Sequence, residues 1–349
     1  MVYLINMLLI LFWNYALPKS INNRKKILCL IYCLQWVLLS GLRNYSVGAD
    51  TLAYKNSFDD VFNTSWGELF RNFTEYFKGV EDIKDPGYAL IEKFCQIFIG
   101  NDYTLFLLII AIVFTVPMAI WVYKYSDNVC LSFMIYSALF YSFFAITGHR
   151  QTIASALVIF GGYECIKKNK WLPLIILQAI AFFIHKSSIC FIALYVVRFI
   201  KINKVYWAFS IIFIILAFIF RAYLMKVLGH VMGYESYTDQ FEGAGAYKFT
   251  FFLLLIFIGA FLLYSKTDKC VDTDYAVKAI TLATIFTPLT FIDPSAMRVV
   301  QYFSVFIMIL VPKLIQTFDY KTRGFAEAMS YIVLIGAIVI NLPHYSFVF

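Results

Sequence analysis

Long runs of apolar residues recur along the whole of this chain, and they restrict it to a fold that lies in a lipid bilayer. Of its 349 residues, 62% are hydrophobic and only 14% are charged, which is more apolar surface than one soluble core can bury. A helix needs about 20 apolar residues to cross the hydrocarbon of a membrane. The length therefore allows about a dozen spans with short connections, and it excludes both a soluble enzyme and a separate soluble domain.

The apolar runs predict an all-α, polytopic membrane protein with about 12 transmembrane helices. The spans are expected at residues 1–17, 27–42, 103–122, 129–147, 152–166, 171–184, 189–200, 205–223, 249–264, 276–292, 299–317 and 325–342. The basic cluster at 19–26 follows the first run, which is the reverse of a cleavable signal peptide and predicts a retained span with its N terminus outside. Lys and Arg are denser in the connections on one side of the membrane, which are predicted to be cytoplasmic. The net charge of +8 therefore reflects orientation and not nucleic-acid binding.

Three segments between the spans complete the expected organisation of the chain as a single multi-spanning membrane domain, residues 1–349. Residues 43–87 and 226–248 are predicted to be long extracytoplasmic loops. The run at 88–100 is too short to cross the membrane and carries two charged residues. It is expected to be a re-entrant or interfacial helix.

Five basic residues enter the predicted outer face from different helices, which points to one anionic ligand. They are Arg43, Arg150, His185, Lys186 and Arg298. Arg150 and Arg298 each open a helix, where the helix dipole and unpaired backbone N–H groups already favour an anion, so a cation is unfavourable there without one. Two or three such Arg side chains can hold a pyrophosphate. The alternative for each is an Arg that snorkels at the interface or pairs with a loop carboxylate.

Acidic and aromatic side chains accompany these basic residues on the same side. Asp50 follows Arg43 in the first outer loop, and Asp85 opens the turn Asp85-Pro86-Gly87-Tyr88, where it can simply cap the next helix. His185 is a lone interfacial histidine, for which a structural role is an equal alternative. The acidic pairs of this loop lack a third ligand and the seven cysteines form no CxxC pair, so no metal site is predicted.

The order of these motifs resembles that of the EpsG-like family of exopolysaccharide and O-antigen repeat-unit polymerases (Wzy type). The matching motifs are Arg43 with Asp50 and Tyr54, Asp85-Pro86-Gly87-Tyr88, Arg150-Gln151 followed by Ala154, His185-Lys186-Ser187-Ser188, and Arg298 with Tyr302. The resemblance covers nearly the whole chain. It implies a bacterial inner-membrane glycosyltransferase with a GT-C-like architecture. Such an enzyme transfers an undecaprenyl-pyrophosphate-linked oligosaccharide onto another lipid-linked repeat unit at the outer face.

The resemblance also suggests roles for the candidate residues. Arg150 and Arg298, helped by Arg43 and Lys186, would bind the donor pyrophosphate and stabilise the leaving group without a metal or other cofactor. The general base would be His185, Asp85 or Asp50, with His185 preferred because the reference pKa of histidine suits neutral pH. Supporting side chains would be those of Gln151, His149, Tyr54, Tyr88, Asp293 and Tyr302. The expected partners are the lipid-linked donor and acceptor, the bilayer and a chain-length regulator, with no nucleic acid.

Two other classes of membrane protein stay open on the sequence. A flippase for lipid-linked oligosaccharides needs cationic residues at mid-membrane depth, for which Arg221 and Lys278 are candidates. A membrane acyltransferase that modifies surface glycans needs a histidine near the cytoplasmic ends to work with a thioester donor. The sequence has no histidine cluster there.

Overall fold

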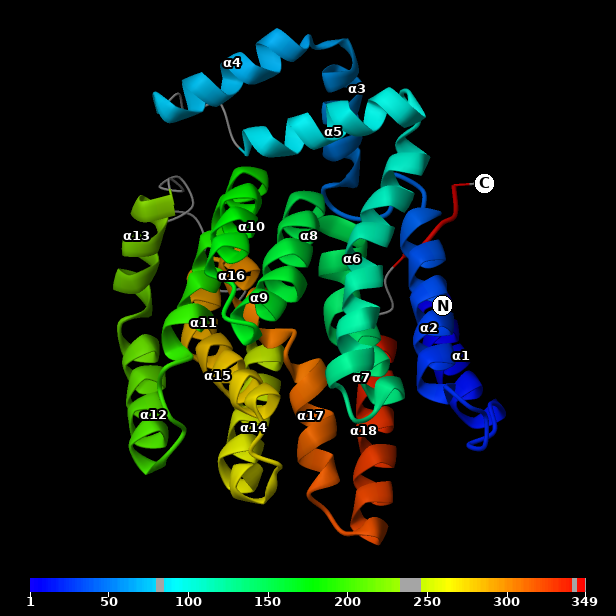
Figure 1. Cartoon of the computed structure of the whole chain (residues 1–349), viewed down its shortest axis with the longest axis vertical. Helices are drawn as coiled ribbons and strands as arrows, with labels where there is room; N and C mark the ends of the chain where they lie inside the picture. Colours follow the sequence, from blue (N-terminus) through cyan, green and yellow to red (C-terminus); the bar gives the residue numbers. More distant parts are fainter. Residues whose placement is uncertain (80–84, 233–245, 341–343, 349) are drawn as a thin grey trace. The chain divides into compact units, whose positions relative to one another are not determined.

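The computed structural model describes residues 1–79, 85–232, 246–340 and 344–348, and the elements that it describes are helical (Figure 1). One isolated bridge, between Arg43 and Phe347, joins the start of the first outer segment to the C-terminal residues. The all-helical class predicted from the sequence is confirmed. Most of the second predicted outer loop, residues 233–245, and part of the first, residues 80–84, lie outside the described residues.

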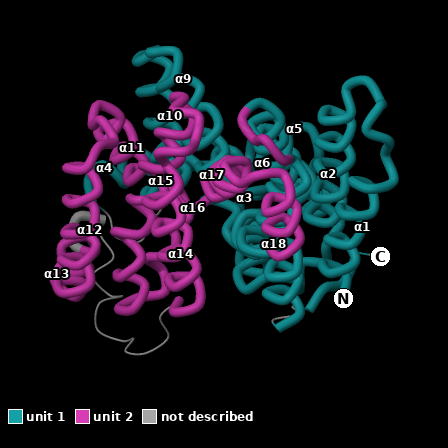
Figure 2. The backbone as a smooth tube through the Cα atoms, turned by 90° about the horizontal axis from the view of Figure 1, so that it is seen from below, with its two compact units in different colours: residues 1–124, 129–188, 330–349 teal, residues 125–128, 189–329 magenta. Residues whose placement is uncertain are grey.

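The chain divides into two compact units, which are coloured separately in Figure 2. The first unit comprises residues 1–124, 129–188 and 330–349, and the second comprises residues 125–128 and 189–329. The residues of the first outer segment, of the turn before Arg150 and of the segment around His185 all belong to the first unit.

The first unit contains the N-terminal helices and the segment that crosses their ends. Its elements are α1 (Val2–Ala16), α2 (Arg24–Gly41), α3 (Thr51–Asn63), α4 (Trp66–Phe77), α5 (Pro86–Ile99), α6 (Tyr103–Tyr125), α7 (Val129–Ile135), η1 (Tyr136–Phe140), η2 (Ser142–Thr147), α8 (His149–Ser155), η3 (Ala156–Gly162), α9 (Tyr163–Lys167), α10 (Trp171–Ile184) and the C-terminal part of α18 (Tyr320–Ile340). In Figure 1, α4 and α5 lie across one end of α6, α8 and α10. Helix α5 contacts α3, α4 and α10, so it can bring loop residues to the ends of the long helices.

The second unit is built mainly from α12, α14, α15 and α17 with short connecting turns. Its elements are α11 (Ile192–Val197), α12 (Lys204–Ile219), α13 (Arg221–Met232), α14 (Tyr247–Leu263), η6 (Tyr264–Lys266), α15 (Val271–Phe286), η7 (Thr287–Phe291), η8 (Pro294–Ala296), α16 (Met297–Ser304) and α17 (Ile307–Gln316); η4 (Lys186–Phe191) joins the two units along the chain. Helix α15 packs against α12, α14, α16 and α17. It is therefore the central helix of this unit.

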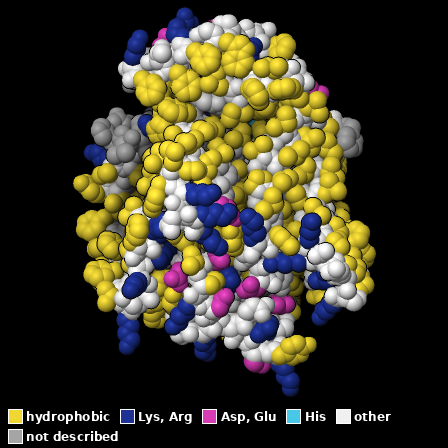
Figure 3. All heavy atoms as spheres, in the orientation of Figure 1, with side chains coloured by type: hydrophobic (Ala, Val, Ile, Leu, Met, Phe, Trp, Pro, Cys, Tyr) yellow, Lys and Arg dark blue, Asp and Glu magenta, His cyan; other side chains and the backbone are white. Residues whose placement is uncertain are grey.

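Within the described residues, three helices are long and apolar enough to cross a membrane. They are Tyr103–Tyr125, Tyr247–Lys266 and Tyr320–Ile340, and two sharply bent helix pairs raise the number to at most five. Hydrophobic side chains cover much of the helix surface in Figure 3. Phe213 is 54% exposed and Phe251 is 64% exposed, as expected of side chains that face lipid. The protein is thus a multi-pass membrane protein, but these helices do not reach the dozen spans expected from the apolar runs.

Local breaks explain why apolar runs outnumber the long helices. The run at 276–292 contains Pro288, and α15 ends at Phe286, because proline cannot continue the helical hydrogen bonds and restricts the residue before it. The run at 129–147 is divided into α7 and two π-helical segments, and 152–166 contains a third, η3. An apolar composition indicates that a segment is buried in lipid, but it does not indicate where the α-helix is interrupted.

The first outer segment contains two helices, α3 and α4, within the predicted loop at 43–87. Helix α4 begins with a side-chain cap in which the Ser65 hydroxyl accepts the Glu68 N–H at 3.2 Å. The pattern Ser-x-x-Glu is a sequence signal for a helix start. The next helix, α5, spans residues 86–99, where a short helix was expected at 88–100.

Candidate functional site

A close approach between α5 and α10 creates the candidate site in the first unit. A Cβ atom added to Gly87 would lie 2.8 Å from the carbonyl oxygen of Phe183, so a larger residue would separate the two helices. The contact joins the first turn of α5 to the last turn of α10. Asp85, just before α5, is thereby placed beside His185, just after α10.

Asp85 occupies the N-cap position of α5, but its carboxylate does not cap the helix. Its backbone is left-handed, with a φ of 51°, a conformation that Asp tolerates better than most residues. Its Oδ1 accepts the backbone N–H of Lys186 at 3.0 Å, and its Oδ2 lies 3.2 Å from Nδ1 of His185. Both carboxylate oxygens of Asp85 therefore contact the segment after α10.

The surroundings of Asp85 keep it ionised. Burial alone would raise its pKa, but the hydrogen bond and electrostatic interaction with His185, the positive charge of Arg150, and the Lys186 N–H together hold the pKa below its ordinary value. The side chain of Asp85 is only 8% exposed. A buried, ionised carboxylate is thus available to orient the neighbouring histidine.

His185 is buried, and one of its ring nitrogens makes no hydrogen bond with the described residues. Because the ionised Asp85 can only accept, we assign the ring proton of neutral His185 to Nδ1, which leaves Nε2 with a lone pair. Nε2 is buried and has no hydrogen-bond partner in the described part of the chain. An unsatisfied buried nitrogen costs about 1–3 kcal/mol. Nε2 can therefore accept a hydrogen bond from a bound ligand.

Arg150 lies in the first turn of α8 and is held loosely. Its Nη1 is 3.6 Å from Oδ2 of Asp85, an ion pair too long for a hydrogen bond. The guanidinium lies 5.6 Å from the ring centre of Tyr54 and 5.2 Å from that of Tyr88. Its Nε has no hydrogen-bond partner among the described residues, and the side chain is 28% exposed. Most donors of this cation are therefore available to a ligand.

Arg43 is held far more firmly. It is 1% exposed, and its guanidinium donates to the carbonyl oxygens of Ser40 and Ile146 and contacts Nε2 of His149 at 2.8 Å. Burial lowers its pKa to about 10, so it remains charged at neutral pH. Gly48 allows this packing because its φ is +105° and a Cβ there would lie 2.9 Å from the Ile146 oxygen. Arg43 thus fixes the turn that leads into α8.

Aromatic rings connect the two arginines. Tyr54 stacks on His149, with ring centres 4.4 Å apart and planes at 19°, and its other contacts include Tyr88 and Arg150. Because a guanidinium can only donate, Nε2 of His149 accepts from Arg43. The first unit therefore contains a continuous series of contacts from Arg43 through His149 and Tyr54 to Arg150.

Three other predicted site residues of the first unit make fewer contacts with Asp85, His185 and Arg150. Lys186 contributes its backbone N–H to Asp85, and its half-buried side chain forms no ion pair with the described residues. Asp50 occupies the N-cap position of α3 without capping it, and it forms no ion pair within the described chain either. Gln151 is buried in the first turn of α8. These positions bring Lys186 next to the acid but leave Asp50 outside the contact series.

The remaining predicted residues belong to the second unit. Arg298 lies in the first turn of α16, as the sequence indicated, and Tyr302 is fully buried one turn later. Asp293 caps η8 by accepting the Ser295 N–H at 2.7 Å, while its Oδ2 is buried without a hydrogen-bond partner in the described chain. Arg298 therefore has the helix-terminal position expected of an anion-binding residue.

Glu92 is a buried group beside the site for which sequence analysis assigned no role. It lies on α5 one turn after Tyr88, is fully buried, and accepts a hydrogen bond from Ser57 at 3.3 Å. Burial raises its pKa to about 8, although the charge of Arg150 opposes the shift. The spacing of four residues between Tyr88 and Glu92 is the signal that places both on one face of α5.

Asp59, an acidic residue of α3, is paired with neighbouring side chains. Asp59 pairs with Lys55 at 2.6 Å and accepts a hydrogen bond from Asn101 at 3.0 Å. No group of three or more His, Cys, Asp or Glu side chains that could hold a metal ion occurs in the part of the chain that the structure describes.

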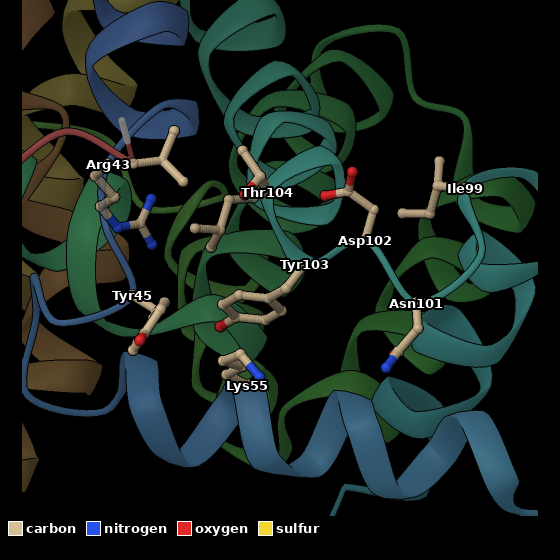
Figure 4. A pocket seen from close by; sticks show the side chains of 10 residues that line it. Arg43, Tyr45, Lys55, Ile99, Asn101, Asp102, Tyr103 and Thr104 are labelled. Atoms are coloured by element: carbon tan, nitrogen blue, oxygen red, sulfur yellow. The ribbon is translucent and has the colours of Figure 1, made fainter.

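Arg43 also lines a cavity of about 550 Å³ in the first unit (Figure 4). Tyr45, Lys55 and Tyr103 lie near Arg43 in this view, and Asn101 and Asp102 lie farther along the wall. The lining combines two phenol rings with charged and amide groups. Such a surface suits a polar ligand with hydroxyl groups.

One protein-family model, described as the EpsG family, matches residues 2–348. The match includes every motif around Arg43, Asp85, Arg150, His185 and Arg298. No curated protein and no solved structure matches this chain.

Proposed function

Since the chain belongs to the EpsG family, which is associated with exopolysaccharide synthesis, we propose that it is a repeat-unit polymerase of the bacterial inner membrane. It transfers an undecaprenyl-pyrophosphate-linked oligosaccharide onto a second lipid-linked repeat unit at the outer face. The proposal includes a GT-C-like arrangement of about 12 spans. The family match agrees with the resemblance found in the motifs.

The grouping of Asp85, His185 and Arg150 is the observation that carries this proposal. Glycosyl transfer to a hydroxyl group needs a base that removes the hydroxyl proton and a cation that stabilises the leaving phosphate. Nε2 of His185 has a free lone pair, and Arg150 has free donors. Asp85 contacts both side chains, so the base and the cation are held close to each other.

In the proposed reaction, the acceptor hydroxyl oxygen attacks the anomeric carbon of the donor sugar. The proton of that hydroxyl moves to Nε2 of His185, and the resulting imidazolium is stabilised by Asp85. The bond between the anomeric carbon and the pyrophosphate oxygen breaks, and undecaprenyl pyrophosphate leaves with the electron pair. Arg150 stabilises the charge that develops on this oxygen, with Lys186 of the same unit as a further cation.

The cavity beside Arg43 supports a place for sugar units in this proposal. Tyr45 and Lys55 in its wall come from the segment between α2 and α4, and Asn101 and Asp102 add hydrogen-bonding groups. Pockets that bind small ligands commonly have volumes of about 300–1,000 Å³, and this cavity of about 550 Å³ falls within that range.

The direct test uses purified protein, undecaprenyl-pyrophosphate-linked repeat units and excess EDTA, with products separated on a gel. A ladder of increasing length that survives chelation is the expected result, because the arginines supply the positive charge. A folded preparation that makes no ladder from its correct repeat unit would contradict the proposal and favour a flippase. A transport assay with the same lipid in vesicles would then test that alternative.

A further inference from the structure

The second unit contains a cavity of about 460 Å³ between α12, α15 and the residues that precede α12. A hydrogen bond of 2.7 Å from the Tyr206 hydroxyl to the Thr281 hydroxyl ties the two helices together at this point. Most of the wall is apolar, with contributions from Val205, Phe209, Phe213, Leu282 and Ile285. None of these residues belongs to the site described above.

Lys278 of α15 lines this cavity and is only 5% exposed. Its Nζ donates to the carbonyl oxygen of Arg198 at 3.0 Å, but no carboxylate forms an ion pair with it in the described chain. Asp274, one turn earlier on α15, instead accepts the Tyr264 hydroxyl at 2.6 Å. Buried lysines are rarely left without an acidic partner, because the charge is costly to desolvate.

Lys278 lies inside α15 and not in its first turn. The residue follows the start of α15 at Val271 by seven positions, which corresponds to about 10 Å along the helix axis. A buried ionisable side chain usually binds a partner of opposite charge or a ligand. Lys201, just before α12, lines the same cavity, so its polar end carries two cations.

We propose that this cavity binds one bilayer phospholipid with an anionic headgroup. Its phosphate lies between Lys278 and Lys201, and one acyl chain follows Val205, Phe209 and Phe213. Phe209 and Phe213 are each 54% exposed, so a lipid can enter from the side of the helix. A neutral headgroup would bring no net negative charge to the two cations, and a small soluble anion would leave the apolar wall uncovered.

The test measures phospholipid binding to the purified full chain in a neutral detergent. Phosphatidylglycerol and phosphatidylcholine are compared by native mass spectrometry and by their effect on the melting temperature. The wild type should prefer phosphatidylglycerol and be stabilised by it. Lys278→Met should weaken that binding about tenfold or more, whereas Lys278→Arg should retain it. Lys204→Met is the matched control, because Lys204 starts α12 but does not line the cavity.

Equal affinity of the wild type for the two lipids would overturn the proposal. The same conclusion follows if Lys278→Met keeps the preference for phosphatidylglycerol. If that variant does not fold, Leu282→Trp fills the apolar part of the cavity while Lys278 stays in place. This variant should lose phosphatidylglycerol binding, and unchanged binding would contradict the proposed path of the acyl chain.

Discussion

Arg43 and Arg150 each follow an apolar run, yet their surroundings in the first unit are opposite. Arg43 is fully buried and uses its donors on the carbonyl oxygens of Ser40 and Ile146 and on His149. Arg150 is partly exposed, is stacked on aromatic rings, and makes one long ion pair with Asp85. Position in the sequence therefore identifies a cation near the site. Whether its guanidinium N–H groups already donate to the protein decides if it can bind a ligand.

Replacement of Arg150 should have the largest effect on activity. Arg150→Ala removes the cation whose donors are free, so single repeat units should remain on the lipid carrier and no polymer should form. Unfolding temperature should change little, because the lost ion pair is long. Arg71→Ala is the control, since Arg71 is an exposed arginine of α4 whose ion pairs among the described residues are with its helix neighbours Glu68 and Glu75. Polymer of normal length from the Arg150→Ala variant would contradict the proposed role of Arg150 in stabilising the leaving phosphate.

Replacement of His185 should reduce the rate by about 10²- to 10⁴-fold, the usual contribution of a general base. His185→Gln keeps a polar side chain of similar size but cannot take up the proton. If Asp85 acts through His185, the double variant Asp85→Asn/His185→Gln should be no slower than His185→Gln alone. Initial rates of repeat-unit consumption measure this. Rate losses that multiply in the double variant would instead show that the acid and the histidine act separately.

Replacement of Arg43 should affect stability more than activity. Arg43→Gln removes the Arg43 donor from the Ser40 carbonyl oxygen and one of two side-chain donors from the Ile146 oxygen, which should lower the free energy of unfolding by about 2 kcal/mol. The rate per folded molecule should stay within about tenfold of the wild type, because Arg150 is retained. Thermal unfolding in detergent, combined with polymer synthesis, separates the two effects. A stable but inactive Arg43→Gln protein would place Arg43 with Arg150 as a ligand-binding cation.

Replacement of Glu92 should have the smallest effect on activity and should change the pH dependence of stability. Glu92 has its pKa raised from 4.5 to about 8, so between these values the folded state binds more protons than the unfolded state. Stability due to this group therefore falls as the pH rises through that window. Glu92→Gln should remove this decline and leave polymer synthesis nearly unchanged. Melting temperatures from pH 5 to 8.5 measure it, and parallel curves for the two proteins would contradict the assigned ionisation.

The helical class and the candidate residues could be predicted from the sequence because composition and local position determine them. Apolar runs indicate segments buried in lipid. The sequence signals for helix starts indicate that Arg150 and Arg298 lie in first turns. The pairing of Asp85 with His185 joins residues 100 positions apart and depends on the approach of Gly87 to Phe183, which no local pattern reveals. The helices α3 and α4 were missed because their partly polar sequence resembles a loop, although Ser65 and Glu68 mark the start of α4.

The contact of Gly87 with Phe183 offers a rule for comparing this chain with its relatives. A side chain as small as a methyl group at that position would separate α5 from α10 and move the carboxylate before α5 away from the histidine after α10. A relative with alanine or a larger residue there must orient its histidine by other means, even if both the aspartate and the histidine are retained. The residue aligned with Gly87 therefore indicates, from sequence alone, which family members can share this acid–histidine pair.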